Sequence, residues 1–168
     1  DLYCRLLEEA MRELKGEDVV EEIEPEIKIG VSAYIPDDYI PDGDQKMEFY
    51  QRLANARKIV ELLGIREEME DRFGRPSIHA QALLHTMEIK VMARQLGLAA
   101  VHLEKSSFRL YFPEGREPAP AAIEHLVGKS TSQLEFKMGD RLCIEIEVGG
   151  RDQQERLEKA RDTIQELL

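Results

Sequence analysis

The sequence has few of the residues that build disulfide-bonded domains or membrane spans. It contains no tryptophan, two cysteines and 6% aromatic residues in 168 positions. Cys4 and Cys143 form no C-x-x-C pair, so the sequence predicts two reduced thiols in a cytoplasmic protein. No run of apolar residues approaches the roughly 18 that a membrane helix requires. A membrane-spanning helix is therefore not expected.

The common catalytic motifs are also missing. The sequence contains no G-x-x-x-x-G-K-[ST] loop, no G-x-G-x-x-G turn, no G-x-S-x-G elbow and no H-E-x-x-H helix. The pair Gly149-Gly150 is not followed by Lys-Ser/Thr, and we interpret it as a turn before the last helix. We therefore predict no catalytic, no cofactor-binding and no metal-binding residues, and we expect that the chain is not an enzyme.

Two groups of side chains leave a metal site open as an alternative. His85 and Glu88 are three residues apart on an expected helix and could share a face, but a third ligand would have to come from elsewhere. Four aspartates crowd one loop, namely Asp37, Asp38, Asp42 and Asp44. Their order does not match an EF-hand loop, so turns and a helix cap are the favoured interpretation.

Negative charge dominates the chain, but it is concentrated near the N-terminus. The formal net charge is −11, and residues 1–48 hold 15 acidic and 5 basic residues. Residues 17–26 contain six acids, no base and one proline, which predicts an exposed, solvated linker. Such a surface repels nucleic-acid phosphates and anionic lipids. We therefore expect neither direct nucleic-acid binding nor membrane binding.

A basic patch in the nearly neutral half of the chain is a further alternative. It would consist of Arg109, Arg116, Lys129, Lys137 and Arg141. If these side chains gathered on one face of a sheet, they could form an accessory contact to nucleic acid. An ordinary surface of mixed charge is the favoured interpretation.

Hydrophobic periodicity predicts an α+β fold. Helices are expected over 2–15, 45–63, 65–73, 77–96, 118–127 and 157–167, with Ser77 as an N-cap and Gly16, Gly64, Gly97 and Gly128 as stops. Strands are expected over 27–31, 99–104, 108–112, 134–137 and 142–148, and those at 99–104 and 108–112 are expected to form a hairpin. These elements form a helical half of three helices packed on a mixed or antiparallel sheet of about five strands, with a ββαββα C-terminal half. Residues 1–26 are expected to be a helix and an acidic linker, and 27–168 one domain. Because the chain begins with Asp1, we expect a piece of a longer protein.

Three stretches of the sequence resemble a bacterial protein family. They are A-Y-I-P-D-D-Y-I-P-D at 33–42, F-Y-Q-R-L-A at 49–54 and E-E-M-E-D-R-F-G at 67–74, followed by Pro76. In this order and spacing they resemble the C-terminal domain of the bacterial transcription-repair coupling factors, the Mfd family. Residues 1–10 resemble the segment that leaves the translocase motor of that family. The resemblance covers about residues 1–104, and residues 105–168 carry no recognisable motif.

The resemblance implies a regulatory role. Proteins of this family are ATP-dependent DNA translocases that displace stalled RNA polymerase and recruit the excision-repair protein UvrA, and their ATP and Mg²⁺ are bound by the upstream motor. The family's C-terminal domain is expected to need no cofactor of its own. It is expected to pack on the N-terminal UvrB-like module of the same chain, to mask the UvrA-binding surface there, and to act in the bacterial cytoplasm.

The matching positions place this intramolecular interface on the helix that ends in D-R-F-G. Glu68 and Asp71 are three residues apart, so both point from one helix face and could bind arginines of the partner module. Arg72 belongs to the same expected interface, and Arg52 and Lys58 on the neighbouring helix are expected at its rim. The alternative is that these residues are ordinary solvated charges.

Overall fold

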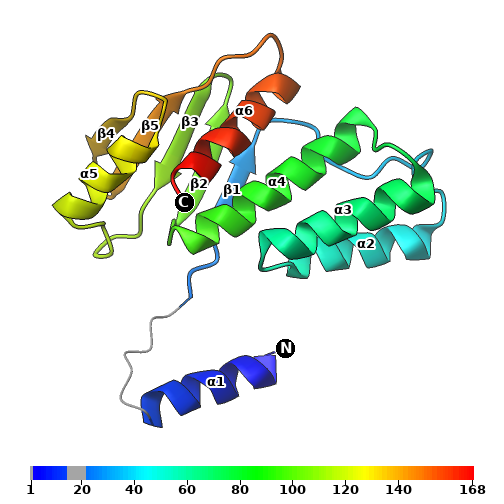
Figure 1. Cartoon of the computed structure of the whole chain (residues 1–168), viewed down its shortest axis with the longest axis horizontal. Coiled ribbons are helices and arrows are strands. Elements are labelled where there is room, and N and C mark those ends of the chain that lie inside the picture. The colour runs from blue at the N-terminus through cyan, green and yellow to red at the C-terminus, as the bar shows by residue number, and fades with distance from the viewer. Residues whose placement is uncertain (1, 15–21) are drawn as a thin grey trace.

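The fold is built around one mixed sheet, as a computed structural model that describes residues 2–14 and 22–168 shows. The strands are β1 (Glu26–Ile29), β2 (Ala100–Glu104), β3 (Ser107–Tyr111), β4 (Glu135–Met138) and β5 (Leu142–Glu147). Their order in the sheet is β1-β2-β3-β5-β4, and only the β1–β2 pair is parallel (Figure 1). The predicted α+β class and the five-stranded mixed sheet are therefore confirmed.

Helices cover one face of the sheet, whereas α1 lies apart from it (Figure 1). In the described part of the chain they are α1 (Leu2–Leu14), α2 (Gly43–Asn55), α3 (Ile59–Phe73), α4 (Ile78–Gln95), α5 (Pro120–Lys129) and α6 (Gln153–Glu166). Figure 1 shows α4 between the sheet and the α2–α3 pair, with α6 beside α4. None of these helices is long and apolar enough to span a membrane.

Two hydrophobic clusters form the core, and α4 contributes to both. The first cluster joins alternating strand residues such as Val101, Leu110 and Ile144 to one face of α4 and to α6. The second cluster joins the opposite part of α4 to α2, α3 and the loop before α2, with Phe49 and Met69 fully buried. Of the three helices expected to pack on the sheet, α4 supplies the contact, and α2 and α3 pack on α4 instead.

The predicted boundary between the second and third helices is wrong. The expected break at Gly64 lies inside α3, and the chain leaves the helix at Ala56, whose ψ is 133°. The Glu61 carboxylate accepts a hydrogen bond from the backbone N–H of Arg57 at 2.9 Å and so stabilises the start of α3. Gly128 likewise lies inside α5, because a single glycine costs a helix only about 1 kcal/mol.

The acidic segment before β1 is not a free linker where the structure describes it. The expected helix stop at Gly16 and residues 17–21 lie outside the described residues. Glu22 and Glu24 form ion pairs with the folded domain, Pro25 is buried, and Glu26 is the first residue of β1. Glu22, Glu24 and Glu26 are exposed, as expected of a solvated segment, but these contacts hold residues 22–26 against the domain.

Candidate interaction site

Arg52, Glu68 and Arg72 form a cluster of charged side chains at the surface shared by α2 and α3. Arg52 Nη1 donates to Glu68 Oε2 at 2.6 Å, and Arg72 Nη1 donates to the same oxygen at 3.2 Å. Glu68 and Arg72 are four residues apart on α3, so the helix itself brings them together. The pairing of α2 with α3 adds Arg52. The structure therefore brings three of the five expected interface residues into one contact, the Arg52–Glu68–Arg72 cluster.

Two aromatic rings pack against the guanidinium groups of this cluster. The guanidinium carbons of Arg52 and Arg72 lie 5.2 and 5.3 Å from the centre of the buried Phe49 ring, and Arg72 lies 5.1 Å from the centre of Phe73. The two rings meet edge to face, with their centres 5.8 Å apart. Cation–π contacts of this kind hold the guanidinium groups in place. Sequence reasoning missed this support, although Phe49 precedes Arg52 by three residues on one helix.

The loop with the A-Y-I-P-D-D-Y-I-P-D sequence holds the end of α3. The Tyr39 hydroxyl donates to the carbonyl oxygen of Gly74 at 2.8 Å, and the Tyr39 ring packs against Phe73 with centres 5.9 Å apart. The Tyr50 hydroxyl accepts a hydrogen bond from the backbone N–H of Ile35 at 2.7 Å and so ties the loop to α2. This sequence therefore positions the helices that carry the charged cluster.

The cluster is ionised and carries one net positive charge. The hydrogen bond from Arg52 lowers the pKa of the Glu68 carboxyl, and Arg72 lowers it further. The same contact raises the pKa of Arg52. Since one carboxylate accepts hydrogen bonds from two guanidinium groups, both arginines retain further N–H donors. These donors can bind an acidic group of a partner.

The other two expected interface residues lie outside the cluster. Asp71 is exposed on α3, one turn beyond Glu68, and the described residues offer it no ion pair. Lys58 is the N-cap residue of α3, ten positions before Glu68 and hence about 15 Å away along the helix. Asp71 can therefore extend the cluster, whereas Lys58 belongs to the opposite end of α3.

Three of the residues considered as metal ligands have other partners, and the buried Nδ1 atom of His85, a fourth, has no hydrogen-bond partner among the described residues. Glu88 is only 6% exposed and faces Arg161 at 3.4 Å and Arg66 at 3.8 Å. Asp37 pairs with Lys46. Asp42 caps α2 by accepting hydrogen bonds from the backbone N–H groups of Asp44 and Gln45 at 2.9 and 3.0 Å. Within residues 2–14 and 22–168, no three or more histidine, cysteine or acidic side chains form a metal-binding group.

The five residues of the possible basic patch do not gather in one place. Arg109, Lys137 and Arg141 line a shallow depression on the sheet, where Glu145 pairs with Lys137 at 2.6 Å and lies 3.7 Å from Arg109. Arg116 lines a different cavity. Lys129 donates to the backbone carbonyl of Leu168 at 2.7 Å. This arrangement does not favour the nucleic-acid alternative, because Asp140 and Glu145 line the depression together with the basic side chains.

Comparison with known proteins identifies relatives along almost the whole chain. The TRCF domain family matches residues 29–123. The transcription-repair-coupling factor of Bacillus subtilis is 35% identical over an alignment of 165 positions that covers 94% of this chain and 14% of the relative. The factor of Escherichia coli K12 is 29% identical over an alignment of 172 positions that covers 99% of this chain and 15% of the relative. The chain thus spans about one seventh of the length of these relatives.

A solved structure shares the fold. It is described as the crystal structure of the C-terminal domain of transcription-repair coupling factor, and it aligns with a TM-score of 0.76. The alignment covers 89% of this chain and 95% of that chain at 19% sequence identity. The likeness includes the part after residue 104, for which the sequence alone offered no motif.

Proposed function

Because the chain belongs to the TRCF domain family of transcription-repair-coupling factors, we propose that it is a non-catalytic, autoinhibitory domain of such a factor. In this proposal the domain docks on the N-terminal UvrB-like module and covers the surface that binds UvrA. The rest of the protein would use ATP and Mg²⁺ to translocate DNA and displace stalled RNA polymerase. The observation that carries the proposal is the Arg52–Glu68–Arg72 cluster with the exposed Asp71 beside it.

The cluster suits a contact that must be reversible. Exposed ion pairs contribute only about 0–1 kcal/mol each and are screened by salt. The aromatic rings fix the two arginines before the partner arrives, so less side-chain entropy is lost on docking. A competing ligand can therefore release the domain by binding better to the undocked state.

We expect the Asp71 carboxylate to contribute to docking on the N-terminal module. We expect this chain to bind the isolated N-terminal module of the same organism's coupling factor and to compete with UvrA for it. Asp71→Ala removes an exposed carboxylate without breaking a described contact and should weaken binding about 5- to 10-fold, which corresponds to about 1 kcal/mol. Glu68→Ala should also weaken binding, because Arg52 and Arg72 lose the carboxylate that orients them beside the rings. Titration calorimetry measures both affinities.

Glu67→Ala is the matched control, because Glu67 is an exposed acid on the same helix without a described ion pair. The affinity of the Glu67→Ala variant for the N-terminal module should stay within about 2-fold of that of the unchanged chain. Equal affinities for the Asp71 and Glu67 variants would contradict this interface. Binding of the chain without any competition by UvrA would contradict the masking of the UvrA surface.

A further inference from the structure

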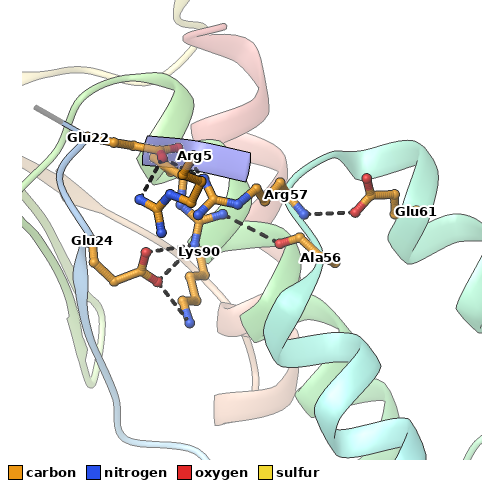
Figure 2. A network of polar contacts seen from close by, with 8 residues as sticks. Arg5, Glu22, Glu24, Ala56, Arg57, Glu61 and Lys90 are labelled. Carbon is orange, nitrogen blue, oxygen red and sulfur yellow. Dashed lines mark hydrogen bonds and ion pairs between the residues drawn. The ribbon is translucent and has the colours of Figure 1, made fainter. Parts of the chain in front are cut away.

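A second charged surface lies at the other end of α3, where the chain enters β1. It consists of Arg57 in the turn before α3 and of Lys90 and Arg94 on α4, and we call it the basic surface. The Arg57 Nη1 atom lies 2.5 and 2.6 Å from the two carboxylate oxygens of Glu22 (Figure 2). The Glu24 carboxylate oxygens lie 2.8 and 2.9 Å from Arg94 Nη2, and one of them lies 3.1 Å from Lys90 Nζ. Residues 22–24 therefore cover this surface as an acidic segment.

Part of the basic surface is held in place by the fold, independently of the acidic segment. Lys90 and Arg94 are four residues apart on α4 and point the same way. The Arg94 side chain is only 8% exposed, and its Nη1 atom donates to the Ala56 carbonyl at 3.4 Å. The backbone of Arg57 is fixed by its hydrogen bond to Glu61 (Figure 2). A donor that is fixed in this way, as Arg94 is, loses little entropy when it binds a carboxylate.

The electrostatics favour carboxylates at this place. The hydrogen bond from Arg57 lowers the pKa of Glu22. Burial alone would raise the pKa of Glu24, but hydrogen bonds from Arg94 and Lys90 outweigh burial and lower it. Arg94 Nε has no hydrogen-bond partner among the described residues, so Glu24 is the group that compensates this nearly buried charge.

The acidic segment does not neutralise the positive charge around it. Arg5 of α1 also pairs with Glu22, at 3.2 Å, so four cationic side chains face two carboxylates. The adjoining cavity of about 800 Å³ is lined by Arg57, Arg94 and Arg116 and by residues of α1. Glu8, Glu9 and Glu22 line it too, and these carboxylates disfavour a continuous phosphate backbone. A short peptide with spaced acidic side chains is the better complement.

We propose that the basic surface is a docking site for acidic peptide segments, which residues 22–24 occupy in cis. An acidic segment of a partner protein takes their place when they dissociate. Since Arg5 of α1 pairs with Glu22, this exchange also breaks that ion pair. The site is separate from the Arg52–Glu68–Arg72 cluster, because the two lie at opposite ends of α3, so either assignment can fail without the other.

The test uses the whole chain and a synthetic peptide of its own sequence, E-D-V-V-E-E-I-E-P-E from residues 17–26, with a fluorescent label. Glu22→Gln/Glu24→Gln should uncover the basic surface and bind this peptide at least about 10-fold more tightly than the unchanged chain, as measured by fluorescence anisotropy at low salt. Adding Arg57→Gln/Lys90→Gln to that variant should abolish the gain. Arg94 is left in place, because its nearly buried side chain supports the fold.

The matched control is Glu124→Gln/Glu158→Gln, which removes two exposed carboxylates for which the structure describes no ion pair. It should bind the peptide no better than the unchanged chain does. Equal affinity of the control and the Glu22→Gln/Glu24→Gln variant would overturn the proposal. So would equal binding of a single-stranded DNA decamer to the uncovered chain, because it would show a general anion surface rather than a peptide site.

Discussion

Among individual side chains, His85 should determine how the stability of the domain depends on pH. It lies on α4, and the charged groups that act on it are Arg161, Arg66 and Asp162. Burial, and then Arg161 and Arg66, lower its pKa to about 4, against about 6.5 in an unfolded chain. As the pH falls, His85 therefore binds a proton in the unfolded state before it does so in the folded state. The contribution of His85 to the free energy of unfolding is complete above about pH 6.5 and is lost as the pH falls towards 4.

We therefore expect His85→Gln to reduce the loss of stability in acid. Between about pH 7 and pH 4.5, urea denaturation should show a decrease in unfolding free energy that is about 1–3 kcal/mol smaller for this variant than for the unchanged chain. His125→Gln is the control, since His125 is exposed on α5. If both variants lose as much stability in acid as the unchanged chain, His85 is not the group responsible.

The contacts of single residues also show how far sequence reasoning reaches. The Glu68–Arg72 contact follows from helical spacing and could be predicted. The Arg52–Glu68 and Arg94–Glu24 contacts join residues that are 16 and 70 positions apart, so no local pattern contains them. The acidic run indicated an exposed linker because its composition is that of a solvated segment. Its actual partners are basic residues of α4 and of the turn before α3, which only the tertiary fold brings near.

The start of α6 depends on Gly150. A Cβ atom on this residue would lie 2.8 Å from Arg156 Cγ and 2.9 Å from the backbone nitrogen of Arg156, within the first turn of the helix. We expect Gly150→Ala to lower the unfolding free energy by about 1–3 kcal/mol, because the helix must shift away from the loop. For a chain of this length that corresponds to a melting temperature lower by about 3–10 °C in a thermal scan followed by circular dichroism.

Gly149→Ala provides the comparison for this loop. Its added Cβ would meet only the Lys159 Nζ atom at 3.9 Å, which is an ordinary contact with a mobile side-chain end. We expect the unfolding free energy of the Gly149→Ala variant to change by no more than about 0.5 kcal/mol. Similar melting temperatures for the two alanine variants would show that α6 does not depend on close packing at Gly150.

Helices and strands with clear local signals could be predicted, and those with ambiguous ones could not. The Ser77 cap, the stop at Gly97 and the β2–β3 hairpin are all in the structure, because capping, positive φ and alternation are local properties. The break between α2 and α3 was missed because apolar residues continue across it with helical spacing. There the Glu61 hydrogen bond and the packing of both helices on α4 decide where the chain turns.

In the domain as a whole, α4 should make the two hydrophobic clusters unfold together. Its buried residues belong to both, with Ile89 in the sheet cluster and Leu84 in the helical cluster, so neither cluster keeps its core if the other is lost. Met69→Ala removes a fully buried side chain from the helical cluster and should lower the unfolding free energy by about 2–5 kcal/mol.

Native-state hydrogen exchange measures whether the sheet cluster loses as much stability as the helical cluster does in the Met69→Ala variant. We expect the most protected amides of α3 and those of strands β2 and β3 to lose the same free energy of protection in the Met69→Ala variant, although Met69 belongs to the helical cluster and not to the sheet cluster. Met47→Ala, at an exposed methionine of α2, should leave both sets of amides unchanged within about 0.5 kcal/mol. Loss of protection confined to α2 and α3 would mean that the helical half opens on its own. The α2–α3 surface with the Arg52–Glu68–Arg72 cluster would then be able to detach from α4 while the sheet stays folded.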